Sequence, residues 1–174
     1  MYDAIHGFVK DAPQFDDITM LCLQYNGSTE TDSLNQSILT VPANLESIEL
    51  LTDFITKQLE AVDCPNDILF SFTLVIEEVC ANIANYAYDG KDGTITAAFS
   101  FDEEDRLAEI VFSDSGIPFD PTAQPNPNVA LPLQKRKVGG LGIYLVKSLM
   151  DEVVYDYFGG QNVLTVRKRL ISDP

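Results

Sequence analysis

The chain has 174 residues, of which 45% are hydrophobic, so it is long enough to bury the core of one full domain. Its 11 lysines and arginines stand against 27 aspartates and glutamates, which gives a formal net charge of −16. This charge argues against non-specific nucleic-acid binding and against docking on anionic membranes, because both require basic surfaces.

The cysteines and the single histidine exclude further classes of site. The three cysteines are widely spaced and form no Cys-x-x-Cys pair, which favours buried free thiols over disulfides or zinc. Because the chain has one histidine, we expect neither a histidine-based metal site nor a catalytic triad. No signal peptide or long apolar run is visible, so we expect a cytoplasmic protein.

The first 36 residues differ in character from the rest. A strand-like run over residues 18–25 follows Asp16 and Asp17, and residues 26–36 are almost entirely polar. Such a polar stretch is typical of a linker. We therefore expect the end of another domain over residues 1–25, a linker over 26–36 and one complete domain over 37–172.

The complete domain begins with a strand and two helices. Residues 37–41 form the strand, and a helix over 45–61 begins after Asn44, a plausible N-cap. Its buried stripe would be Leu45, Ile48, Leu51 or Thr52, Ile55 and Leu59. A second helix has Pro65 in its first turn and ends near Gly90.

Strands dominate the rest of the chain. Residues 93–101 and 107–112 alternate as strands, and a proline-rich loop covers residues 113–138. A glycine-rich entry at residue 139 leads into a helix that ends at Met150, and strands 153–158 and 163–170 form a hairpin. The predicted fold is α+β, a two-layer sandwich of a mostly antiparallel mixed sheet with helices on one face.

The second helix carries polar residues on a mostly apolar cylinder. One face should be buried, because apolar residues recur on it at helical spacing: Phe72, Ile76, Val79, Ile83 and Tyr86. Glu78, Asn82 and Asn85 form a neighbouring stripe at the same spacing. A carboxylate and two amides on a buried helix need partners or a cleft.

Three motifs could together hold a nucleotide. Glu78-x-x-x-Asn82 places two oxygen-bearing side chains one turn apart, which suits Mg²⁺ shared with phosphates. Asp114-Ser-Gly-Ile-Pro118 offers a carboxylate for an exocyclic amine, and Gly116 would let a flat ring approach. Gly139-Gly-Leu-Gly142 opens a helix whose backbone N–H groups suit phosphates.

Each motif alone has an ordinary structural explanation, namely a helical polar pair, a turn and a tight helix entry. Neither glycine segment matches the Walker or dinucleotide fingerprint. The three in this order, with a proline-rich lid between the second and third, are far more specific. Residues 37–170 resemble the GHKL ATPase superfamily, and specifically the anti-sigma-factor serine/threonine kinases of bacterial partner-switching systems.

The resemblance rests on three boxes of sequence. Glu-Val-Cys-Ala-Asn-Ile-Ala-Asn-Tyr-Ala, from Glu78, resembles the N box of the superfamily. Asp-Ser-Gly-Ile-Pro-Phe-Asp-Pro, from Asp114, resembles its first glycine box, and Gly-Gly-Leu-Gly-Ile-Tyr-Leu-Val-Lys, from Gly139, resembles its second. The resemblance implies a Bergerat-type ATP site.

The roles of individual residues follow from this resemblance. Glu78 would activate the attacking hydroxyl, Asn82 would coordinate Mg²⁺ with ATP, and Asp114 would hold the adenine amine. The other expected nucleotide contacts are Asn85, Gly116, Pro118, Lys135, Arg136, Gly139, Gly140, Leu141, Gly142 and Thr165. For four of these an ordinary role is about as well supported: a strand residue for Thr165, a solvated loop for Lys135 and Arg136, and a local backbone cap for Asn85. Tyr86 departs from the histidine that the family often has there.

The implied function is an ATP- and Mg²⁺-dependent kinase that phosphorylates a STAS-domain anti-anti-sigma partner and thereby regulates a sigma factor. The alternative is a catalytically weak ATP-binding module that sequesters a sigma factor or a STAS partner. A histidine kinase would need a phosphoacceptor helix, and gyrase-, chaperone- or mismatch-repair-type ATPases a transducer domain. Exposed apolar surface could serve a homodimer or sigma binding equally well.

The first residues carry a second resemblance. Phe-Asp-Asp-Ile-Thr-Met-Leu-Cys-Leu, from Phe15, resembles the closing motif of PPM-type serine/threonine phosphatases. Asp16 would be a metal ligand there if that domain were complete. The chain therefore looks cut from a phosphatase–kinase fusion, although an exposed aspartate pair before a strand is the simpler alternative.

Overall fold

The computed structural model describes residues 36–123 and 141–171, all within one compact unit, Ser33–Pro174. The elements are β1 (Ser37–Pro42), α2 (Ser47–Ala61), α3 (Asn66–Asn82), the π-helical turn η1 (Ile83–Ala87), β2 (Thr94–Asp102), β3 (Leu107–Asp114), α4 (Leu141–Leu149), β4 (Glu152–Phe158) and β5 (Gln161–Arg169). The predicted domain fragment, its Asp16 and most of the linker lie outside the described residues.

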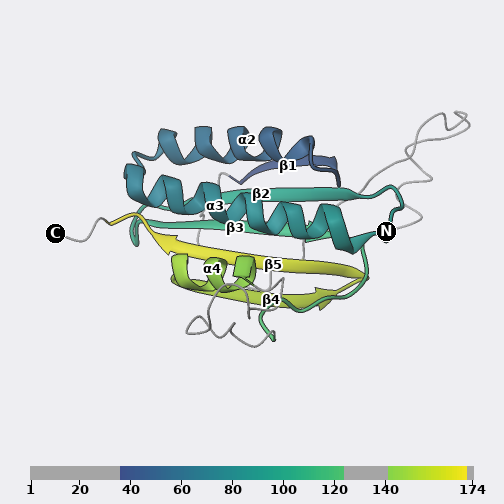
Figure 1. The fold of residues 1–174 in the computed structure, drawn as a ribbon. Helices are drawn as coiled ribbons and strands as arrows, with labels where there is room; N and C mark the ends of the chain where they lie inside the picture. The colour runs from purple at the N-terminus through teal and green to yellow at the C-terminus, as the bar shows by residue number, and fades with distance from the viewer. Residues whose placement is uncertain (1–35, 124–140, 172–174) are drawn as a thin grey trace, which may run out of the picture. The chain divides into compact units, whose positions relative to one another are not determined.

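The strands form one sheet with the order β1-β2-β3-β5-β4, and α2, α3 and α4 lie on one of its faces (Figure 1). This confirms the predicted α+β sandwich. Every pairing between the described strands is antiparallel, so this sheet is not mixed. Among the helices of residues 36–123 and 141–171, none is long and apolar enough to cross a membrane.

The core lies between the sheet and α2 and α3. Successive strand residues point to opposite faces, so alternate residues of β2, β3 and β5 meet the helices. The fully buried side chains from both layers include Leu51, Ile55, Leu59, Phe72, Val75, Ile76, Ile95, Ile110, Phe112 and Val166. Removing this apolar surface from water fixes α3 against the sheet, and α3 carries the N box.

Helix α2 begins two residues later than predicted. The N-cap is Glu46, which makes no side-chain cap hydrogen bond, so the prediction for Asn44 is wrong by position. Asn44 Oδ1 instead supports the preceding turn, because it accepts hydrogen bonds from Ser47 N at 2.9 Å and Ser47 Oγ at 2.8 Å. The intervening residues form a turn, and Leu45 is 58% exposed. The predicted stripe is therefore correct at Leu51, Ile55 and Leu59 and wrong at Leu45.

The α-helical part of the second predicted helix ends at Asn82 and continues as the π-helical turn η1. A π-turn is wider than an α-turn, so it shifts the phase of the residues that follow it. Tyr86 is consequently 73% exposed, although α-helical spacing predicts that it is buried with Phe72 and Val79. The prediction for Tyr86 is wrong for this reason.

Candidate functional site

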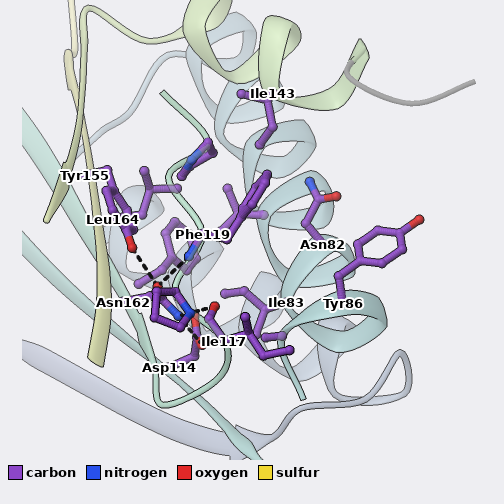
Figure 2. A pocket seen from close by; sticks show the side chains of 15 residues that line it. Asn82, Ile83, Tyr86, Asp114, Ile117, Phe119, Ile143, Tyr155, Asn162 and Leu164 are labelled. Carbon is purple, nitrogen blue, oxygen red and sulfur yellow. Dashed lines mark hydrogen bonds between the residues drawn. The ribbon is translucent and has the colours of Figure 1, made fainter. Parts of the chain in front are cut away.

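A pocket of about 430 Å³ lies where the end of α3, η1, the end of β3, the start of β5 and α4 meet. Apolar side chains dominate its lining, with a few polar groups among them, as is usual for small-molecule sites. The lining residues are Val79, Asn82, Ile83, Tyr86, Ala87, Phe112, Asp114, Ile117, Pro118, Phe119, Pro121, Ile143, Tyr155, Asn162 and Leu164 (Figure 2).

Asp114 supplies the carboxylate of this pocket. It ends β3 on the helix-covered face of the sheet and is only 7% exposed. Its Oδ1 accepts hydrogen bonds from Gly116 N at 2.8 Å and from Asn162 Nδ2 at 2.9 Å. No hydrogen bond from residues 36–123 or 141–171 reaches Oδ2. This oxygen is therefore left to accept a hydrogen bond from a ligand.

Gly116 allows the loop after β3 to pack against η1. A Cβ on Gly116 would overlap the carbonyl oxygen of Ala87 and lie 2.6 Å from Ala87 Cβ. The next residue, Ile117, donates its backbone N–H to Ala87 O at 2.7 Å. The glycine thus has a packing role, and the end of η1 forms one wall of the pocket together with Ile117 and Pro118.

Asn162, which sequence reasoning missed, lies at the centre of a hydrogen-bond network (Figure 2). Its Oδ1 accepts from Tyr155 Oη at 2.7 Å and from Phe119 N at 3.1 Å. Its Nδ2 donates to Asp114 Oδ1 and, at 3.2 Å, to Ile117 O. An asparagine beside a hairpin turn is usually a turn residue. The overlooked signal is that Asn162 alternates with Leu164 and Val166 on the buried face.

Tyr155 is a neutral donor in this network. Burial raises the pKa of its phenol, and the nearby Asp120 and Asp114 carboxylates act in the same direction. The hydroxyl therefore keeps its proton well above neutral pH.

Asn82 lines the pocket, and no described residue forms a hydrogen bond with its side chain. In residues 36–123 and 141–171, no three histidine, cysteine or acidic side chains gather as a ready-made metal cage. Mg²⁺ in nucleotide sites commonly keeps water ligands and shares the phosphates, so one amide oxygen is sufficient protein support. Asn82 fits that requirement.

Glu78 lies one turn before Asn82 but does not line this pocket, and its carboxylate lies against Gly142 at the start of α4. Glu78 lines an open groove between α2 and α3, with a volume of about 500 Å³. The other residues of this groove are Leu45, Ile48, Glu49, Thr52, Asp53, Glu77 and Ala81. The two residues of the Glu78-x-x-x-Asn82 motif are thus divided between the groove and the pocket.

Two predicted contacts lie elsewhere. Thr165 pairs with Val111 on β3 and with Val154 on β4, and it alternates with the pocket residue Leu164. Its side chain is therefore on the opposite face of the sheet, which contradicts the predicted nucleotide contact. Asn85 is exposed, and its Nδ2 donates to Ala81 O at 2.8 Å, so it caps local backbone instead of lining the pocket.

The second glycine box is described only from Leu141 onward. Leu141 begins α4 and is 55% exposed, while Gly142 packs against the Glu78 carboxylate. Lys135, Arg136, Gly139 and Gly140 lie outside the described residues, so their expected phosphate contacts stay predictions.

Residues 41–168 match the family model described as a histidine kinase-like ATPase domain. The chain is 31% identical over 119 residues to the serine-protein kinase RsbW of Halalkalibacterium halodurans, covering 66% of this chain and 72% of that protein. It is 28% identical over 133 residues to the serine-protein kinase RsbW of Bacillus cereus (strain G9842), covering 74% and 82%.

Proposed function

Since the chain belongs to the family of histidine kinase-like ATPase domains, the GHKL ATPases, we propose that it is an ATP- and Mg²⁺-dependent serine/threonine protein kinase of the anti-sigma-factor type. Its acceptor is a STAS-domain anti-anti-sigma protein, and phosphorylation sets how much sigma factor is free. This role places the protein in the cytoplasm. The similarity to serine-protein kinases supports the proposal.

The observation that carries the proposal is the state of Asp114. Among the described residues it is the buried carboxylate of an apolar pocket, and one of its oxygens has no protein donor. An acceptor of this kind suits the exocyclic amine of adenine. Ile83, Phe119 and Leu164 provide apolar surface on which the flat base can rest.

The phosphate end of the nucleotide would lie toward Asn82 and the start of α4. Asn82 would offer its amide oxygen to Mg²⁺, which neutralises phosphate charge during transfer. The first backbone N–H groups of α4 have no partner within the helix, so they favour an anion at that end.

Glu78 would receive the acceptor from the groove between α2 and α3. The partner's serine or threonine oxygen forms a bond to the γ-phosphorus, while the bond from that phosphorus to the β,γ-bridging oxygen breaks. The hydroxyl proton passes to the Glu78 carboxylate. Because Glu78 lines the groove and Asn82, one helical turn further along, lines the pocket, the acceptor and the nucleotide can approach from two sides.

A catalytically weak module that sequesters a sigma factor or STAS partner is the second candidate. One experiment distinguishes the kinase from the sequestering module. The protein is incubated with ATP, Mg²⁺ and STAS proteins from the same genome, and the products are analysed by intact-mass spectrometry. We expect one STAS protein to gain the mass of one phosphoryl group. ATP binding without transfer would favour sequestration, and absence of both would overturn the assignment.

A further inference from the structure

We propose that Asn162 is the positioning residue that holds Asp114 ready for the exocyclic amine of an adenine base, and that Tyr155 fixes the orientation of Asn162. The inference rests on the proposed nucleotide-binding function and adds the residues that set its base specificity. Asn162 lies on β5 and Tyr155 on β4, outside the three sequence boxes of the superfamily.

The side chain of Asn162 has no hydrogen-bonding capacity left for a ligand. A primary amide offers two N–H donors and two acceptor positions on its oxygen. Here Nδ2 donates to Asp114 Oδ1 and Ile117 O, while Oδ1 accepts from Tyr155 Oη and Phe119 N. Asn162 therefore acts on a ligand through Asp114.

The network also determines which way the amide faces. A flipped Asn162 would put its nitrogen against the Phe119 N–H, and its oxygen against two acceptors, Asp114 Oδ1 and Ile117 O. The Tyr155 hydroxyl adds a second donor on the oxygen side, at 2.7 Å. Together these contacts favour the orientation in which nitrogen faces Asp114.

Asp114 is thereby prepared as a single acceptor. Gly116 N and Asn162 Nδ2 both donate to its Oδ1, and this leaves Oδ2 for the ligand. A carboxylate oxygen that only accepts selects a base edge with a donor, such as the 6-amino group of adenine. It disfavours the 6-oxo group of guanine or hypoxanthine, which is itself an acceptor.

Asn162 also connects the Asp114 carboxylate, which would accept from the base, to the wall of the pocket. Ile117 and Phe119 both line the pocket, and both are bonded through their backbone to the Asn162 side chain. One buried amide thus sets the position of the carboxylate and of two apolar residues that flank the base. With Asn162 and Asp114 each 7% exposed, these bonds are little weakened by water.

The test uses Asn162→Asp, which keeps the size of the side chain and the oxygen that accepts from Tyr155 and Phe119. It replaces the donor toward Asp114 by a second acceptor. Affinities are measured by calorimetry with Mg²⁺ for ATP and for purine riboside triphosphate, which lacks the 6-amino group. We expect ATP to bind about 10- to 100-fold more weakly, as for loss of a hydrogen bond to a charged group. The affinity for purine riboside triphosphate should change far less.

A pH series supplies a readout that loss of structure would not give. In the Asn162→Asp variant, the introduced carboxyl and that of Asp114 would share one site, which raises the pKa of one of them. Its proton restores a donor between the two groups, so the preference of the variant for ATP should recover as the pH falls. Besides burial, Asp120 and Tyr157 raise the pKa of Tyr155. All three residues are present in wild type and variant, so they do not cause a difference between the two pH profiles.

Two further variants make the result decisive. Asn66→Asp adds the same charge at the exposed start of α3, about 24 Å along the axis from Asn82 at about 1.5 Å per residue, and should bind like wild type. Tyr155→Phe removes one donor without adding charge and should lower the ATP preference about 2- to 10-fold. If thermal unfolding shows that Asn162→Asp is not folded, the Tyr155→Phe variant tests the proposed role of Asn162 in its place.

The possible outcomes separate the inference from the proposed function. An unchanged ATP preference in the folded variants, or an equal loss of affinity for both nucleotides, would overturn the role of Asn162. A wild-type protein that binds no ATP would overturn the proposed function instead.

Discussion

Gly142, at the start of α4, lies directly against the carboxylate of Glu78 on α3. A Cβ on Gly142 would overlap Glu78 Oε2 and lie 2.8 Å from Glu78 Cδ. Any larger residue would therefore push on the side chain expected to accept the proton of the attacking hydroxyl. Two sequence motifs that are far apart in the chain meet at this contact, and the absence of a side chain at Gly142 allows it.

The substitution Gly142→Ala should lower the rate of phosphotransfer and leave the thermal stability nearly unchanged. The atoms that the new methyl group meets belong to the far end of a flexible side chain, so Glu78 can move aside while the fold persists. A misplaced catalytic group can cost about 10²-fold in rate. We expect at least a 10-fold lower kcat with little change in Tm, measured against Ser148→Ala on the exposed side of α4. An unchanged kcat would show that the position of Glu78 does not matter.

Glu78→Gln should slow phosphotransfer about 10²- to 10⁴-fold while ATP binding is retained. The amide keeps the size of the side chain but cannot accept the hydroxyl proton, and general-base catalysis contributes about 10²- to 10⁴-fold. ATP affinity should fall far less than the rate, because Glu78 contacts Gly142 at the start of α4 but does not line the apolar pocket proposed for the base. The measurements are single-turnover transfer and nucleotide titration, with the exposed Glu60→Gln as control. Full transfer by Glu78→Gln would refute its catalytic role.

Asp114→Asn should reverse the choice of nucleobase. The variant can still accept from Gly116 N and Asn162 Nδ2 at Oδ1, but its own amide nitrogen then replaces Oδ2. A donor at this place meets the amine of adenine unfavourably and the 6-oxo group of hypoxanthine favourably. We expect ATP affinity to fall about 100-fold relative to ITP in competition titrations. If the ATP-to-ITP ratio stays at its wild-type value, Asp114 does not read the base edge.

Much of the pocket could be predicted from the sequence, because spacing along α3 and the end of β3 determine which way side chains point. Asn82, Asp114 and Pro118 all line the cavity as the motifs indicate. The N box is helical, as its periodicity predicts, up to Asn82. The positions of these side chains could be predicted because each depends on local geometry alone, while their contacts with nucleotide and Mg²⁺ stay predictions.

The wrong predictions for Tyr86 and Thr165 share one cause: each assigned a residue to the wrong face of a helix or strand. One π-turn is enough to rotate Tyr86 out of the buried stripe, and no residue in η1 marks such a turn in the sequence. On β5, a shift of one residue separates the pocket face from the opposite face, so Thr165 and the overlooked Asn162 lie on different sides. A buried polar residue between Leu164 and the hairpin is the clue that points to Asn162.

The buried thiol of Cys80 should make the folded state less stable in alkali. Burial raises its pKa to about 12 from the ordinary 9.0, so the unfolded chain releases this proton at a lower pH than the native protein. The contribution is therefore absent below about pH 9 and destabilises the fold between about pH 9 and 12, by at most about 1.4 kcal/mol per pH unit. Urea unfolding at pH 8 and 10 should show a smaller loss of unfolding free energy for Cys80→Ala than for wild type. Burial also raises the pKa of the Cys64 thiol, to about 11. Cys64→Ala, unfolded at the same two pH values, is therefore the variant with which Cys80→Ala is compared. Equal losses in wild type and Cys80→Ala would show that the Cys80 thiol is not held neutral by the core.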